Sequence, residues 1–195
     1  MSTNQLINEA LQKLINGNER FADSKSINPN QTIERRNEVL QGQNPFAVIV
    51  GCSDSRVPPE IIFDQGIGDL FIIRTAGNIV DDVALGSIEY AVDHLGTPIV
   101  VVLGHGKCGA VTATVQGGEA HGHIGSIVKT ILPAVEKAKT QSGDLTNNSI
   151  KANIGLVVDT IKSAKPIITA ALEQGKVMVV GAYYDIESGE VEFIL

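Results

Sequence analysis

Two apolar segments of the sequence each lead directly into side chains that can bind a metal ion. Cys52, Asp54 and Arg56 follow the first segment at every second position, and His105 and Cys108 follow the second. Cysteine thiolates and histidine nitrogens are common ligands of zinc, and a catalytic zinc site keeps its fourth position open for water or substrate. Three protein ligands, Cys52, His105 and Cys108, therefore predict a zinc centre that can perform chemistry.

The two cysteines, which are the only ones in the chain, also admit two other interpretations. Free cysteine is among the most buried residue types, so both thiols could be inert parts of a core. A redox pair is the second alternative, although the Cys-x-x-Cys spacing of such pairs is missing. Ligand-type residues after both apolar segments favour the metal site over either alternative.

The role of Asp54 stays open at the level of the sequence. As a fourth zinc ligand it would close the site, whereas paired with Arg56 it could accept a proton from zinc-bound water. Asp54 could also simply stabilise the turn in which it lies. The other histidines are weaker candidates: His94 ends a predicted helix, and His121 and His123 lie in a glycine-rich linker, where they could at most relay protons.

The distribution of apolar residues predicts an α/β fold. Short apolar runs alternate with segments of helical periodicity, which favours a central, mostly parallel sheet of about five strands flanked by helices. A turn at Ser188-Gly189 makes the last strand an antiparallel edge strand. A chain that leaves a parallel strand arrives at the carboxyl edge of the sheet, where open α/β folds place their ligands. The predicted strands cover 46–50, 70–74, 99–103, 177–184 and 191–194, and the main predicted helices cover 82–95, 107–116, about 127–135 and about 150–174 with a break near Pro166.

The first part of the chain, residues 1–42, predicts an N-terminal helical arm on a single domain that covers 1–195. The first helix, 4–18, has apolar residues along one face and is expected to end at Gly17. Thr32 can cap a second helix. The first helix has more apolar surface than a short arm can bury on itself, so we expect the arm to pack on the domain body or on a partner subunit.

Composition narrows the class of protein. The 195 residues are 43% hydrophobic and carry a formal net charge of −7, which argues against nucleic acid or an anionic membrane as a partner. No apolar run approaches the roughly 20 residues that span a bilayer. The first residues lack a basic segment followed by an apolar one, so we expect a cytoplasmic protein rather than a secreted one.

The combined pattern resembles the signature of the β-class carbonic anhydrases. It consists of Cys52-x-Asp54-x-Arg56 and, some fifty residues later, His105-x-x-Cys108-Gly109. The similarity extends from the segment 18–21 to the terminal hairpin. The resemblance implies one zinc ion per subunit, held by Cys52, His105 and Cys108, with Asp54 and Arg56 as a catalytic dyad. In some members of the family this aspartate instead coordinates zinc and shuts the enzyme off.

The resemblance also implies residues that bind the substrate. Gln43 is similar to a glutamine that hydrogen-bonds substrate across a dimer interface, and Phe71, Tyr90 and the Gly109 amide are similar to the lining of the CO2 pocket. Self-inhibited members build a bicarbonate site with a tryptophan three residues before the first cysteine. This sequence has Ile49 there and contains no tryptophan, so an active-type site is expected.

The function implied is the reversible hydration of carbon dioxide to bicarbonate and a proton, through attack of zinc-bound hydroxide on CO2, in a homodimer or homotetramer. Hydrolysis of CS2 or COS on the same zinc site is the enzymatic alternative. A non-catalytic zinc or bicarbonate-binding module is the alternative of another class. The Asp54–Arg56 pair argues against the module, because a purely structural zinc site needs neither residue.

Overall fold

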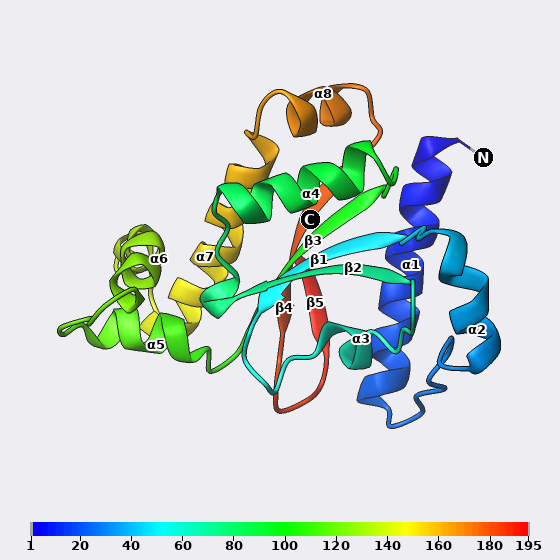
Figure 1. Cartoon of the computed structure of the whole chain (residues 1–195). Coiled ribbons are helices and arrows are strands. Elements are labelled where there is room, and N and C mark those ends of the chain that lie inside the picture. Colours follow the sequence, from blue (N-terminus) through cyan, green and yellow to red (C-terminus); the bar gives the residue numbers. More distant parts are fainter. Residues whose placement is uncertain (1, 195) are drawn as a thin grey trace.

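The protein is built on one five-stranded sheet with the strand order β2-β1-β3-β4-β5, seen in a computed structural model that describes residues 2–194 (Figure 1). The first four strands run parallel and β5 pairs antiparallel with β4. This confirms the predicted α/β fold with a parallel centre and an antiparallel edge strand. The strands are β1 (Ala47–Cys52), β2 (Leu70–Thr75), β3 (Ile99–His105), β4 (Met178–Tyr184) and β5 (Val191–Ile194).

Helices cover both faces of the sheet because side chains along each strand alternate between the two faces. In β1, Val48, Val50 and Cys52 enter one apolar core, while Ala47 and Ile49 enter the other. The first core is closed by α4 (Asp82–Asp93), α5 (Gly109–Gln116), α6 (Ile124–Ala138), α7 (Leu145–Lys162) and α8 (Ile167–Glu173), and the second by α1 (Thr3–Ala22) and α3 (Pro59–Ile62).

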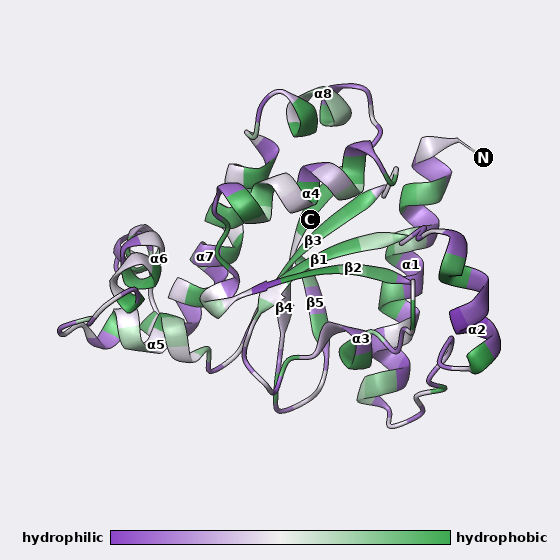
Figure 2. Cartoon of the chain, in the orientation of Figure 1, coloured by the Kyte–Doolittle hydropathy of each residue, from purple (hydrophilic) through white to green (hydrophobic). Residues whose placement is uncertain are grey.

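The two central strands bring the predicted ligands to one edge of the sheet. Every residue of β1 and β3 is buried, as expected for apolar strands inside a parallel sheet, and both strands are coloured as hydrophobic over most of their length (Figure 2). The two strands are parallel neighbours, with Gly51 opposite Leu103. Cys52 and His105 are their last residues, so both lie at the carboxyl edge.

The N-terminal arm divides into two parts. Helix α1 begins after Ser2, whose side chain accepts a hydrogen bond from the Gln5 amide, and it buries Ala10 and Leu14 on this chain's own sheet. Helix α2 (Ile33–Glu38) and the 3-10 turn η1 (Val39–Gln41) leave their side chains exposed or half-buried. Packing of the arm on a partner subunit stays a prediction.

The expectation that the first helix ends at Gly17 is wrong, because α1 continues to Ala22. Gly17 is buried where α1 crosses the end of α3. A Cβ atom at this position would lie 1.9 Å from the carbonyl oxygen of Phe63, so the glycine serves a close approach between two backbones. The two helices could not pack at this distance with any larger residue.

Gly17→Ala is therefore expected to lower the free energy of unfolding by about 1–3 kcal/mol, the usual cost of overpacking. Urea unfolding at equilibrium measures it. Gly155→Ala is the matched control, since Gly155 lies inside α7 and a Cβ there would meet nothing within 4 Å. The control should gain about 0.5–1 kcal/mol from helix propensity. Equal effects of the two substitutions would contradict the close-approach explanation.

A buried carboxylate ties the end of α1 and the loop after it to the segment that follows α3. Asp64, 2% exposed, accepts hydrogen bonds from Arg20 Nε at 2.6 Å and from the amides of Ile27 and Asn28 at 3.1 and 2.9 Å. Burial alone would raise the pKa of Asp64, but these three donors outweigh it and the pKa is lowered. The charged form of Asp64 is thus the one that the fold stabilises.

Asp64→Asn should cost about 2 kcal/mol of unfolding free energy at neutral pH, the scale of a hydrogen bond to a charged group. Because the pKa of Asp64 is lower in the folded state, its carboxylate stabilises the fold fully at pH values above the unfolded-state pKa of about 3.9. This stabilisation is lost as the pH falls through the folded-state pKa. The difference between wild type and variant should therefore shrink in acid. The exposed Asp159 on α7 offers the matched control, Asp159→Asn. A difference that does not depend on pH would contradict the assignment.

No helix within residues 2–194 combines the length and the apolar character needed to cross a membrane.

Candidate metal centre

The structure brings the three predicted zinc ligands together in the interior. Cys52 ends β1, His105 ends the neighbouring β3, and Cys108 is the residue that precedes α5. Their ligand atoms all lie within 4.8 Å of one another, and the residues are 5%, 0% and 1% exposed. Two sulfurs and one nitrogen in this arrangement are a donor set that zinc prefers.

His105 is oriented so that one ring nitrogen is left for a ligand. Its Nδ1 lies 2.9 Å from the carbonyl oxygen of Gly106, which can only accept, so the ring hydrogen is on Nδ1. The lone pair is then on Nε2, which is buried and meets no hydrogen-bond partner anywhere in residues 2–194. A metal ion on Nε2 would satisfy this atom, and the residues present fit a metal ion.

The two sulfurs differ in their surroundings. Cys52 Sγ accepts hydrogen bonds from the backbone amides of Asp54 and Gly77, at 3.4 and 3.3 Å. The pKa of the Cys52 thiol is lowered, first because Cys108 donates to it and also because of these amides. The pKa of Cys108 is raised, first by the same contact and then by burial. Two thiolates this close together repel each other, so a cation between them would stabilise both sulfurs in the form that binds a metal.

Asp54 is engaged by Arg56 in this structure. Arg56 donates from Nε to Asp54 Oδ1 at 2.9 Å and from Nη2 to Oδ2 at 2.7 Å, a bidentate pair. The guanidinium holds the pKa of the Asp54 carboxyl well below its ordinary value. Asp54 lies outside the three-residue ligand cluster, with Oδ2 4.0 Å from His105 Nε2. In this structure the Asp54 carboxylate is therefore paired with Arg56 and ionised, which suits it to accept a hydrogen bond; whether it also binds a metal ion stays a prediction.

The turn after β1 is braced by a second arginine. Arg74, near the end of β2, donates to the carbonyl oxygens of Cys52 at 2.8 Å and Asp54 at 2.6 Å. Arg56 also reaches across to the carbonyl oxygen of Lys107, at 3.1 Å. The guanidinium group of Arg56 thus joins the two ligand-bearing loops, and that of Arg74 ties the first loop to β2. No motif in the sequence pointed to this bracing contact of Arg74.

A short loop after β2 forms one wall of the centre. Gly77, in the turn η2 (Ala76–Asn78), donates to Cys52 Sγ and accepts at its carbonyl from Asn153 Nδ2 at 2.9 Å. Asn78 is 2% exposed, and its Nδ2 meets no partner in the part of the chain that the structure describes. Asn153 lies on α7, far along the sequence, and no motif pointed to it.

The predicted substrate residues are not gathered around the ligands of this one chain. Phe71 and Tyr90 contact each other, with ring centroids 6.3 Å apart, but Phe71 lies opposite Val48, four residues before the end of β1. Gln43 is exposed and precedes β1, whose six residues span roughly 17 Å between it and the metal edge. Gly109, by contrast, directly follows Cys108 and begins α5, where its amide has no partner within the helix.

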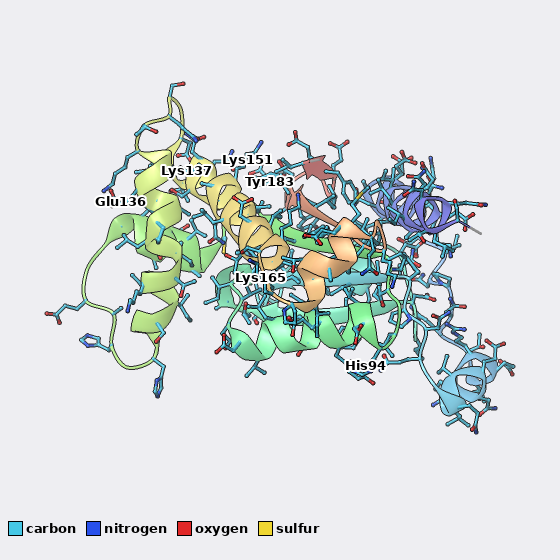
Figure 3. All side chains as sticks on the ribbon, turned by 90° about the horizontal axis from the view of Figure 1, so that it is seen from above. His94, Glu136, Lys137, Lys151, Lys165 and Tyr183 are labelled. Atoms are coloured by element: carbon cyan, nitrogen blue, oxygen red, sulfur yellow. The ribbon has the colours of Figure 1, made fainter. Side chains whose placement is uncertain are left out.

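The remaining histidines stay apart from the ligand cluster. His94 follows α4 and contacts Tyr90, with ring centroids 5.3 Å apart, at the edge of the molecule (Figure 3). A cleft of about 770 Å³ adjoins the metal loop through Gly106, Lys107 and Gly109. Tyr183 helps to line the cleft, and Lys151 of α7 lies 5.2 Å from the centroid of its ring (Figure 3).

Comparison with known proteins gives a consistent match. Residues 47–191 match the family model described as carbonic anhydrase. A carbonic anhydrase of Mycolicibacterium smegmatis is 39% identical, over 94% of this chain and 91% of its own length. A Coccomyxa β-carbonic anhydrase solved with acetazolamide superposes with a TM-score of 0.74 at 27% identity, over 94% of this chain and 86% of its own. A tetrameric β-carbonic anhydrase of Sordaria macrospora shares the fold, with a TM-score of 0.77 at 24% identity, over 95% and 97% of the chains.

Proposed function

This chain belongs to the β-class carbonic anhydrases, enzymes whose general activity is the hydration of carbon dioxide, and we propose that it performs this reaction with one zinc ion. Cys52, His105 and Cys108 would hold the ion. The observation that carries the proposal is their buried cluster beside an ionised carboxylate, with Asp54 Oδ2 4.0 Å from His105 Nε2. A purely structural zinc site does not need a carboxylate at that position.

The chemistry divides between the ion and the side chains around it. Bound zinc would lower the pKa of a water molecule and so provide a nucleophile near neutral or mildly alkaline pH. Asp54, kept ionised by Arg56, accepts a hydrogen bond from the nucleophile at Oδ2 and orients it toward CO2. The Gly109 amide would donate to an oxygen on which negative charge develops as bicarbonate forms. Arg56 and Arg74 keep these groups in position.

A second subunit completes the substrate pocket in this proposal. Gln43, Phe71 and Tyr90 are the residues that the family resemblance assigns to substrate, and within one chain they lie away from the ligand edge. The tetrameric relative from Sordaria macrospora supports self-association. Exposed apolar side chains on the arm, Ile33 at 62% and Leu40 at 73%, also favour a partner. The assembly we propose is a homodimer or homotetramer whose active sites lie between chains.

The closest rival is hydrolysis of CS2 or COS on the same centre. Stopped-flow turnover of CO2, CS2 and COS by the zinc-loaded protein, across neutral and mildly alkaline pH, separates these reactions. We expect fast CO2 hydration with a rate that rises with pH, and little or no release of sulfide from CS2 or COS. Sulfide production with no CO2 hydration would contradict it. A protein that binds zinc and turns over none of the three would instead be a binding module.

A further inference from the structure

The loop that flanks Cys52 is fixed by hydrogen bonds on both sides of Gly77. The Gly77 amide donates to Cys52 Sγ at 3.3 Å, and its carbonyl oxygen accepts from Asn153 Nδ2 at 2.9 Å. Asn153 comes from the middle of α7, 76 residues later in the chain. A helix on one face of the sheet is thus connected, through one residue, to a predicted metal ligand.

The conformation of this loop needs such support. Gly77 and Asn78 both have positive φ, 73° and 47°, a region that L residues rarely adopt. A Cβ atom on Gly77 would lie 2.7 Å from Ile131 Cδ1 and 3.2 Å from Ala110 Cβ, so the loop is wedged against α5 and α6. Packing alone therefore excludes larger residues but provides no hydrogen-bond partner for the Gly77 carbonyl.

A polar residue such as Asn153 is unusual on the buried face of α7. It is 2% exposed, among the apolar residues with which α7 covers the sheet. A buried amide group is costly unless it is hydrogen-bonded, and a leucine of similar size would pack there without that cost. The one side-chain hydrogen bond recorded for Asn153 among the described residues goes to Gly77. The polar group is thus directed at the loop that touches Cys52.

We propose that Asn153 is a positioning residue of the metal centre, which acts through Gly77 to keep a backbone N–H on the sulfur of Cys52. This inference rests on the proposed function, since it needs a metal ion on that sulfur. Hydrogen bonds to a ligating sulfur withdraw electron density from it and so tune the metal. The ion held by two thiolates stays a stronger Lewis acid because Cys52 donates less charge to it.

The test uses the full-length protein with cobalt(II) in place of zinc. Cobalt on a thiolate gives a sulfur-to-metal charge-transfer band whose energy falls as the sulfur becomes more electron-rich. Asn153→Leu removes the donor and Asn153→Ser shortens the side chain so that its hydroxyl falls short of the Gly77 carbonyl; the smaller serine keeps the test available if leucine prevents folding. We expect the band to move to longer wavelength in both, and zinc affinity in chelator competition to weaken about tenfold.

Asn148→Leu and Asn148→Ser are the matched controls. Asn148 lies on the same helix and donates to the Ser142 carbonyl at 3.0 Å, away from the metal loop. The controls should leave band and affinity unchanged. If the Asn153 variants only lower thermal stability while the band stays in place, the residue is merely structural and the inference is overturned. A wild type with no thiolate-to-cobalt band would overturn the proposed function itself, and the inference with it.

Discussion

Replacing Asp54 by asparagine is expected to lower kcat for CO2 hydration by about two orders of magnitude or more, while the protein still binds one zinc ion per chain. Positioned acid–base groups contribute on the order of 10²–10⁴ in rate. Asparagine has nearly the same shape, but it lacks the charge that accepts a hydrogen bond from the nucleophile and that pairs with Arg56 at 2.7 Å. Stopped-flow assays at saturating CO2, together with zinc analysis, measure both quantities.

The exposed Asp159 provides the control for this change. Asp159→Asn removes the same charge from α7, far from the ligand cluster, and should leave kcat unchanged. Loss of zinc from Asp54→Asn would show that the carboxylate is a ligand after all, in contrast to its pairing with Arg56 in this structure. An unaltered kcat with full zinc content would remove Asp54 from the mechanism.

Replacing Cys108 by serine is expected to abolish CO2 hydration and to weaken zinc binding by more than about 100-fold, beyond the usual effect of altering a residue that only supports a ligand. Serine has a similar size, so the fold should survive the change. A buried hydroxyl cannot supply the second thiolate of the donor set. Zinc competition with a chromophoric chelator and the hydration assay give the two readouts.

Metal removal from the wild type is the companion experiment. Chelation should abolish activity and make Cys52 and Cys108, the only cysteines of the chain, more reactive toward thiol reagents, because a metal ion no longer occupies their sulfurs. Added zinc should restore activity in the wild type but not in Cys108→Ser. Persistent activity in the metal-free wild type, or full restoration of the variant, would exclude Cys108 as a ligand.

The parts of the site that sequence reasoning found are those fixed by strand ends. Cys52 and His105 each follow a short apolar run, and parallel neighbouring strands must deliver them to the same edge. Cys108 lies three residues after His105, at the start of a predicted helix, where both side chains can reach one ion. These three residues needed no knowledge of side-chain packing, so their meeting could be predicted. The orientation of Asp54 could not, because two alternatives differ only in a side-chain rotation.

The misses have a common physical cause, which is contact between distant segments. A glycine such as Gly17 is typical of the end of a helix. Here the residue is limited to glycine by the carbonyl oxygen of Phe63, at the end of α3. Asn153 and Gly77 share no spacing pattern, and only the packing of α7 on the sheet brings them together. The single-domain organisation, the partner-subunit contacts and the cytoplasmic location stay predictions.

The most direct test of the account is a zinc titration of the metal-free protein, followed by stopped-flow CO2 hydration at each step. We predict a rate that rises linearly with added zinc and stops rising at one equivalent per chain, because one Cys52–His105–Cys108 centre forms in each. Tight binding of one zinc per chain with a hydration rate no higher than that of buffer would contradict the assignment of this centre as the active site.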